Sequence, residues 1–214
     1  MVAAQAEKTS TKTRERIMDA AEDLFIEHGY SATSLRAIAQ SAEVNLAATH
    51  YHFGSKFGLL AEVFHRRIQP IDEAWLAGLD ELEAHGGTLT VRGIVEAFLA
   101  PILQCGDTDP ELLERLPRLA GRIMGEPESL TKPLLEGELT EVASRYQAAL
   151  AKALGEASPD IAWHFHFFLG GMIHLMRLQA PLGHAPSAQT LRQGIAALTD
   201  FAVAGFNQLK EDSR

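Results

Sequence analysis

Hydrophobic residues recur at helical spacing along almost the whole chain. Between residues 13 and 28, the apolar side chains fall on one face of a helix and most charged side chains fall elsewhere. The apolar members of this face are Ile17, Ala21, Leu24 and Phe25. Two shorter helical segments follow, at about 34–41 and 45–51, and no segment shows the two-residue alternation of a strand. The pattern therefore predicts an all-α protein.

Short polar stretches separate these first helices. Gly29 is typical of a helix C-cap, the hydroxyls of the polar segment 30–34 are suited to capping the second helix, and Asn45 and Ser55 can cap the helices that follow them. The residues before Thr13 have no apolar core and are expected to form a loose polar tail. The chain is thus expected to open with short helices joined by tight turns.

Helical periodicity continues after Pro70. Six further helices are expected, at 71–84, 89–104, 109–125, 128–154, 159–180 and 188–209. The breaks between them contain glycine or proline, which interrupt helices. With the N-terminal segments, the chain should hold about nine helices.

Two short helices joined by a tight turn and supported by a third form a helix-turn-helix. In that motif the second helix, here residues 45–52, lies in the major groove and presents its first residues to base edges. Small side chains at its start would let the backbone approach the groove floor, while hydroxyls and cations nearby would contact phosphates. The residues expected to contact DNA are Thr33, Ser34, Arg36, Asn45, Leu46, Ala47, Ala48, Thr49, His50, Tyr51, His52 and Lys56.

Each of these features also has an ordinary structural explanation. Short helices with tight turns are common in helix bundles, and His50 or His52 alone would more often be a surface or packing residue. Basic residues between Lys8 and Arg16 could reach a neighbouring groove or form a solubilising end. The ordered combination of these features favours DNA binding.

Charge and cysteine content refine this expectation. The net charge is −9, but residues 1–67 carry equal numbers of basic and acidic residues, so the excess falls on the remainder. An acidic remainder would be repelled by DNA and would orient a neutral DNA-binding part toward it. Cys105 is the one cysteine, which fits a reducing cytoplasm, and the apolar run from Trp163 to Leu178 is too interrupted by histidines for a membrane span.

The stretch T-S-L-R-A-I-A-Q-S-A-E-V-N-L-A-A-T-H-Y-H-F-G-S-K-F-G-L-L, residues 33–60, resembles the DNA-binding domain of the TetR (tetracycline-repressor-like) family. The resemblance covers about residues 11–70, and its most specific part is the block from Tyr51 to Lys56. It implies a homodimeric repressor that binds a palindromic operator, with a helical effector-binding and dimerisation domain over 71–214. It gives Tyr51, His52 and Lys56 contacts to the DNA backbone, and residues 45–50 the reading of sequence.

The chain departs from the family pattern in the turn and in the second helix. Glu43 stands where glycine is usual, so a left-handed backbone there is either strained or absent. Thr49 replaces a large aliphatic residue and His50 replaces tyrosine or asparagine, which puts the operator sequence in doubt. The run from Asn45 to Ala48 resembles a branch that includes regulators of lipid and fatty-acid metabolism, which suggests an apolar or acyl effector.

Two late segments are apolar on several faces, over 161–179 and 188–209. Two such helices from each subunit would close a four-helix dimer interface, as the resemblance also implies, although both could instead complete the core of one chain. The residues expected in that interface are Trp163, Phe167, Leu191, Ile195, Leu198, Ala202 and Phe206.

An apolar effector pocket is expected between segments 89–125 and 128–180. Arg118 and Arg122 lie one turn apart and could anchor an acidic headgroup, or could pair with surface glutamates. A stripe of aromatic residues and methionines is, however, more often plain core. The expected ligand contacts are Phe98, Ile102, Cys105, Arg118, Arg122, Phe165, Phe168, Met172 and Met176.

No catalytic constellation emerges from the sequence. Nucleophile elbows, phosphate-binding loops and zinc-protease motifs are absent, and His164 and His166 point to different faces of one helix. No cofactor or metal is therefore expected. The competing hypothesis is a small-molecule carrier or enzyme, built in the helical part, whose N-terminal helices no longer read DNA.

Overall fold

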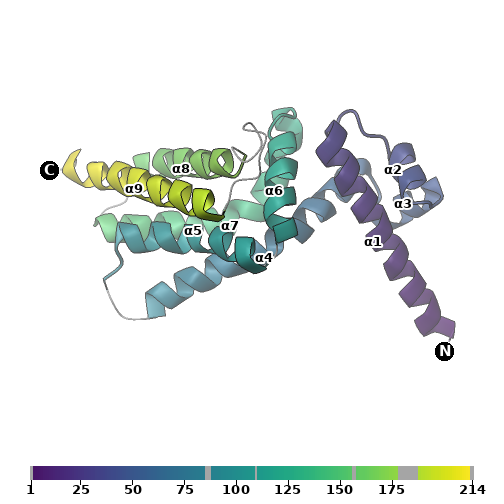
Figure 1. Ribbon diagram of the computed structural model, residues 1–214, viewed down its shortest axis with the longest axis horizontal. Helices are drawn as coiled ribbons and strands as arrows, with labels where there is room; N and C mark the ends of the chain where they lie inside the picture. Colours follow the sequence, from purple (N-terminus) through teal and green to yellow (C-terminus); the bar gives the residue numbers. More distant parts are fainter. Residues whose placement is uncertain (1, 85–87, 109, 156–157, 178–187, 213–214) are drawn as a thin grey trace. The chain divides into compact units, whose positions relative to one another are not determined.

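The computed structural model describes residues 2–84, 88–108, 110–155, 158–177 and 188–212 (Figure 1). All regular structure in these ranges is helical, which confirms the predicted all-α class. The helices are α1 (Val2–His28), α2 (Leu35–Ser41), α3 (Leu46–Phe53), α4 (Lys56–Ala84), α5 (Val91–Thr108), α6 (Pro110–Ile123), α7 (Glu128–Leu154), α8 (Asp160–Arg177) and α9 (Ala188–Asp212). In the same ranges, no helix is long and apolar enough to cross a membrane.

Two expectations about helix boundaries were wrong. The polar N-terminal stretch is helical from Val2, because alanine and other strong helix formers dominate it. Helix α4 also continues through Pro70 instead of ending there. An internal proline costs a helix about 3 kcal/mol. Ile68 and Ile71, both about 5% exposed, bury apolar surface on either side of it and offset that cost.

Contacts between Cα atoms divide the chain into two compact units. The head unit comprises Met1–Ile68 together with Arg118–Leu134, and the body unit comprises Gln69–Pro117 together with Leu135–Arg214. The end of α6, the α6–α7 turn and the start of α7 thus group with the N-terminal helices. The expected division into domains at residues 70 and 71 stays a prediction.

In the head unit, α2 and α3 pack against each other and both contact α1 (Figure 1). The core of this unit consists of apolar residues that α1, α2 and α4 contribute at helical spacing. Its fully buried members are Ile17, Ala21, Ile38, Leu59, Leu60 and Val63. Burial of that stripe fixes which face of α2 and α3 remains outside.

In the body unit, α9 packs against both α5 and α8, and the three helices run side by side (Figure 1). Glycines allow α8 and α9 to approach closely. A Cβ atom on Gly194 would lie 2.4 Å from Leu175 Cδ1, and one on Gly171 would lie 2.9 Å from Leu198 Cδ1. The small residues of these helices therefore serve packing within one chain.

Candidate nucleic-acid interface

Side chains outside the helices set the start of each short helix. The Ser34 hydroxyl oxygen accepts a hydrogen bond from the backbone N–H of Ala37 at 3.1 Å, and Asn45 Oδ1 accepts one from Ala48 at 2.8 Å. Both residues have extended backbones, as N-caps do. The predicted caps of α2 and α3 are therefore confirmed, and both capping residues are exposed.

The turn between α2 and α3 contains the residue that departs from the family pattern. Glu43 adopts φ 52°, so the left-handed conformation is present even though the residue is not glycine. Arg16 of α1 secures this turn by donating to the carbonyl oxygens of Ala42, at 2.5 Å, and Glu43, at 3.2 Å. Arg16 thus stabilises the turn between α2 and α3 from its position on α1, a role that was not expected from the sequence.

One face of α3 is open to solvent. The Tyr51 side chain is 83% exposed and Leu46 is 42% exposed, whereas Phe53 turns into the core. Asn45, Ala47 and His50 are exposed as well. Ala48 and His52 are half-buried. The exposed row starts at the N-terminal end of the helix, which is the end that reaches base edges in a helix-turn-helix.

Two threonines do not fit their expected role at DNA. Thr33 is 3% exposed and its hydroxyl donates to the Gly29 carbonyl oxygen at 2.7 Å. Thr49 is 1% exposed and its hydroxyl donates to the Leu46 carbonyl oxygen at 2.7 Å. A hydroxyl has one proton to donate, and both protons are used inside the head unit. Thr49 faces inward because it occupies a core position of α3.

His50 keeps one ring nitrogen for an external partner. Its Nδ1 donates to the Gly54 carbonyl oxygen at 3.2 Å, which places the proton on that nitrogen in the neutral ring. Nε2 is then an acceptor on the exposed face of α3, suited to the amino group of adenine or cytosine in the major groove. The ring of Tyr51 packs edge-on to His52, with centroids 5.2 Å apart.

Lys56 is tied into the head unit at the start of α4. Its ammonium donates to the carbonyl oxygens of Tyr30, at 2.9 Å, and Thr33, at 2.8 Å, and lies 4.1 Å from the centroid of the Tyr30 ring. Two of its three N–H groups therefore hold the α1–α2 turn. The expected phosphate contact of Lys56 stays a prediction, and the third N–H is the one that would make it. Arg36 is exposed on α2.

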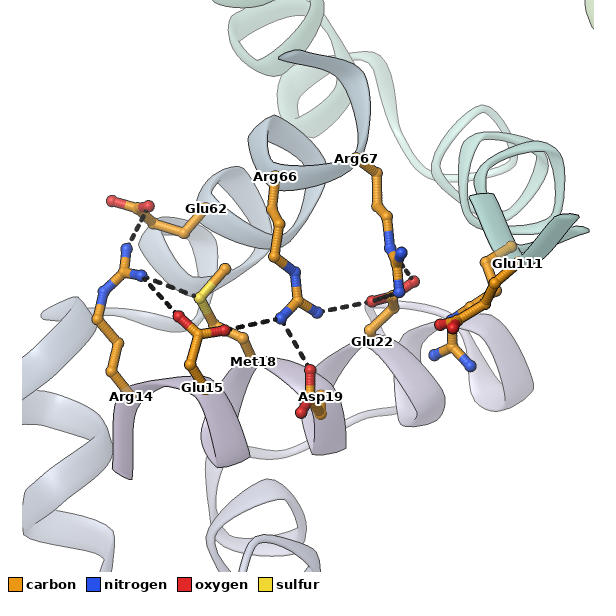
Figure 2. A network of polar contacts seen from close by, with 10 residues as sticks. Arg14, Glu15, Met18, Asp19, Glu22, Glu62, Arg66, Arg67 and Glu111 are labelled. Atoms are coloured by element: carbon orange, nitrogen blue, oxygen red, sulfur yellow. Dashed lines mark hydrogen bonds and ion pairs between the residues drawn. The ribbon is translucent and has the colours of Figure 1, made fainter. Parts of the chain in front are cut away.

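A network of charged residues joins α1 to the first half of α4 (Figure 2). Glu22 is buried and accepts from Arg66 Nη2 at 2.7 Å and from Arg67 Nε at 2.8 Å. Arg66 also donates to Asp19 at 2.8 Å, and Glu15 lies one turn before it on α1. Burial lowers the pKa of Arg66, but its hydrogen bonds to Asp19 and Glu22 raise that pKa more, so the guanidinium stays charged.

The expected ligand residues separate between the two units. Phe98, Ile102, Phe165, Phe168 and Met172 are buried together in the body unit. They belong to an aromatic cluster in which the Phe98 ring stacks on Trp75 at 4.5 Å. The side chains of Cys105 and Met176 lie outside the described residues.

Arg118 and Arg122 fall in the head unit instead. The expectation that Arg122 anchors an acidic ligand does not fit, because its guanidinium donates to the carbonyl oxygens of Ile26, at 3.0 Å, and Glu27, at 2.9 Å. Arg118 is exposed on α6.

Some of the residues expected in the dimer interface are exposed and others are buried. Trp163 and Phe167 are exposed on α8, each at 62%, as a dimer surface requires. Ile195, Ala202 and Phe206 are instead at most 5% exposed, because α9 turns them toward α5 and α8 of the same chain. Leu198 is half-buried, and the side chain of Leu191 lies outside the described residues.

The sequence analysis missed Phe201, which is 72% exposed on α9. It lies about a quarter of the way around that helix from the apolar stripe that includes Leu198 and Phe206, so the stripe alone did not indicate it.

Over the described part of the chain, no group of three or more histidine, cysteine, aspartate or glutamate residues is arranged to hold a metal ion. The candidate site is the exposed surface of α2 and α3.

Comparison with known families yields two matches along the chain. The family described as "Bacterial regulatory proteins, tetR family" matches residues 17–63. The family described as "Tetracyclin repressor-like, C-terminal domain" matches residues 96–205. The first match covers α2 and α3 entirely, and the second covers about half of the chain.

Curated relatives are transcription regulators. The HTH-type transcriptional regulator UidR of Escherichia coli is 35% identical over 155 residues, which cover 70% of this chain and 71% of that protein. TcmR of Streptomyces glaucescens is 29% identical over 143 residues, or 61% of this chain and 58% of that protein. SrpR of Pseudomonas putida is 39% identical over 70 residues, or 33% of this chain. The chain thus spans 31% of SrpR and 58% of TcmR, less than two thirds of each.

Solved structures share the fold. A putative fatty acid metabolism regulator from Clostridium perfringens superposes with a TM-score of 0.64 at 19% identity, covering 89% of this chain and 97% of that one. The fatty acid degradation regulator FadR from Bacillus halodurans gives a TM-score of 0.64 at 15% identity, covering 89% and 98%. At these identities the likeness concerns the arrangement of the helices alone.

Proposed function

Because the chain belongs to the TetR family of bacterial regulatory proteins, we propose that it is a homodimeric transcription repressor that binds a palindromic operator and is released by a small-molecule effector. The family relatives are DNA-binding regulators and not enzymes. The single observation that carries the proposal is the exposed row of residues along the capped helix α3.

Helix α3 is proposed to enter the major groove. Leu46 and Ala47 would contact thymine methyl groups, and His50 Nε2 would accept a hydrogen bond from a base amino group. Tyr51, which projects furthest, would donate to a phosphate oxygen. Ser34 and Arg36 at the start of α2 would contact phosphates as well. Thr33 and Thr49 support these residues from within the head unit.

A second copy of the chain is proposed to cover the exposed aromatic face of α8 and α9. The Trp163 and Phe167 rings stack with centroids 6.1 Å apart, Gly170 is exposed beyond them, and Phe201 projects from α9. Large exposed aromatic side chains are enriched at interfaces between proteins. Phe201→Glu should therefore convert a dimer to a monomer in analytical ultracentrifugation, and an unchanged dimer would place the interface elsewhere.

The effector is proposed to bind in the body unit and to be apolar or acyl. The aromatic residues around Phe98 supply the surface for such a ligand, and Met172, buried one turn along α8 from Phe168, has a side chain that adapts its shape. Two of the solved structures that share the fold are described as regulators of fatty acid metabolism or degradation. Fatty acids and acyl thioesters are therefore the first compounds to test for release of DNA.

The deciding experiment is a gel shift with the full chain and DNA from the upstream region of its own gene, repeated at rising salt. We expect a competitor-resistant complex whose affinity falls as salt rises. Arg36→Ala should weaken binding to all sequences. It should also reduce the slope of log affinity against log salt concentration by about one, as expected for the loss of one phosphate contact. His50→Ala should change which operator variant is preferred.

Selection from random DNA would follow if the upstream region gives no shift. Failure of that selection as well would contradict the repressor and favour the carrier or enzyme, which would bind or convert a ligand without retaining DNA.

A further inference from the structure

Residues 118–134 lie far along the chain from α1–α3 and yet belong to the head unit. Two charged side chains of this segment contact the head unit's first helix and the turn after it: Arg122, near the end of α6, contacts the last turn of α1, and Glu126, in the α6–α7 turn, contacts the α1–α2 turn. Neither contact belongs to the helix-turn-helix itself, whose two short helices are capped by Ser34 and Asn45.

Arg122 closes the C-terminal end of α1. Its Nε donates to the Ile26 carbonyl oxygen at 3.0 Å and its Nη2 to the Glu27 carbonyl oxygen at 2.9 Å. The last carbonyl groups of a helix have no partner within the helix and lie at the negative end of its dipole. A guanidinium satisfies two of them with charge-assisted bonds.

Glu126 occupies a set of donors in the turn that follows. Its carboxylate accepts from the Ser31 backbone N–H at 3.0 Å, from the Ser31 hydroxyl, and from the Tyr30 backbone N–H. Burial raises the pKa of Glu126, but these hydrogen bonds and the charge of Lys56 lower it more, so that the carboxyl group titrates below its ordinary value. The carboxylate is thus held as an anion.

The backbone at Gly29 is shaped for this approach. Its φ of 83° lies in the left-handed region, and a Cβ atom there would come within 3.2 Å of Glu126 Oε1. The left-handed backbone favours glycine at this position, and any larger residue would crowd the carboxylate of Glu126.

The α1–α2 turn is connected to two residues of the proposed DNA surface, Lys56 through hydrogen bonds and Ser34 through the chain. Lys56 donates to the carbonyl oxygens of Tyr30 and Thr33, which flank Ser31. Ser34, the N-cap of α2, follows Thr33 in the chain. A shift of the turn would therefore move the start of α2 and the ammonium of Lys56 together.

We propose that Arg122 and Glu126 are positioning residues for DNA binding, which hold Ser34 and Lys56 in their DNA-contacting geometry through the α1–α2 turn. This proposal rests on the proposed function.

The test compares the full-length chain with Glu126→Ala, Glu126→Gln and Arg122→Lys, with Glu128→Gln as the matched control. Glu128 is an exposed glutamate two residues away, at the start of α7. Three quantities are measured: operator affinity against salt, hydrogen exchange of the amides of residues 29–33, and the thermal unfolding midpoint.

We expect Glu126→Ala to lower the affinity for DNA from the upstream region by about tenfold. The slope of log affinity against log salt concentration should fall by about one, because Lys56 loses its fixed position and with it one phosphate contact. Amide exchange at residues 29–33 should accelerate in the same variant. Glu126→Gln and Arg122→Lys keep part of the hydrogen bonding and should give smaller losses, while Glu128→Gln should match the wild type.

An affinity loss with an unchanged salt slope would reflect general destabilisation and would overturn the positioning role. Wild-type affinity and slope in all three variants, with faster exchange, would overturn it too. If Glu126→Ala does not fold, the two conservative variants decide by the same criteria. A wild-type chain that binds no operator contradicts the proposed function itself, so the two failures are distinguishable.

Discussion

Each of the two units is stabilised internally by a different kind of interaction. In the head unit, the buried Glu22 carboxylate joins α1 to α4 through Arg66 and Arg67 (Figure 2). In the body unit, the centre is a cluster of rings around Phe98, which stacks on Trp75 and meets Tyr146 edge-on at 4.8 Å. The first depends on directional charged hydrogen bonds and the second on apolar contact area.

The difference matches what each unit is proposed to do. Hydrogen bonds between charged groups fix distances and angles, so α1 and α4 keep one register and α3 is presented in one geometry. Ring packing tolerates rearrangement when volume is conserved, and a region that admits an apolar ligand needs that tolerance. Disruption of the two units should therefore have different consequences.

The largest effect should come from the ring cluster. Phe98→Ala should destabilise the body unit by about 4 kcal/mol, since the ring is 1% exposed and its loss leaves a cavity among four aromatic neighbours. Urea unfolding followed by tryptophan fluorescence measures this, because Trp75 lies in contact with the missing ring. Phe98→Leu should lose less than half as much. Equal losses in the two variants would argue against tight ring packing.

Removal of the buried carboxylate should weaken the head unit nearly as much. Glu22→Gln leaves two guanidinium groups without their shared anion, and such a loss typically costs about 3 kcal/mol. Circular dichroism during urea unfolding would report it. Glu15→Gln, on the same network but with a side chain 49% exposed, should change stability by less than about 0.5 kcal/mol. A similar cost at both positions would mean that burial does not decide the strength of the network.

A hydrogen bond inside the ring cluster tests whether directional bonds also stabilise the body unit. The Tyr146 hydroxyl donates to the Trp75 carbonyl oxygen at 2.8 Å, and burial raises the pKa of Tyr146 far above its ordinary value. Tyr146→Phe removes one neutral hydrogen bond and should cost about 1 kcal/mol. Denaturant unfolding of the variant beside the wild type measures it. A cost near that of Phe98→Ala would show that the body unit depends on directional bonds as the head unit does.

The smallest effect should be a gain. Glu43→Gly should stabilise the head unit by about 0.5 kcal/mol, because relief of the left-handed strain exceeds the added entropy of the unfolded chain. Arg16 keeps its bonds to the backbone of the turn in this variant. Differential scanning calorimetry would detect the gain, and Glu43→Ala, which keeps the strain, should show none. Stabilisation by alanine would attribute the effect to the removed charge instead.

Local features of the chain were predictable from sequence. Ser34 and Asn45 act as caps through bonds to amides three residues away, so the relevant partners are visible in the sequence itself. Helical periodicity likewise predicted the all-α class and the positions of most helices. The same local reasoning failed at Pro70, because burial of Ile68 and Ile71 in the folded chain offsets the cost of an internal proline.

The sequence by itself determined the all-α class, most of the helices and the caps of α2 and α3, since each follows from neighbours within one or two turns. Only the tertiary structure decided that Arg122 binds the end of α1 and Glu126 the α1–α2 turn, about a hundred residues earlier, and that Phe206 is core while Phe201 is exposed. The physical reason is that periodicity tells which face of a helix is apolar, and not which partner covers it. That choice depends on packing between helices far apart in the chain.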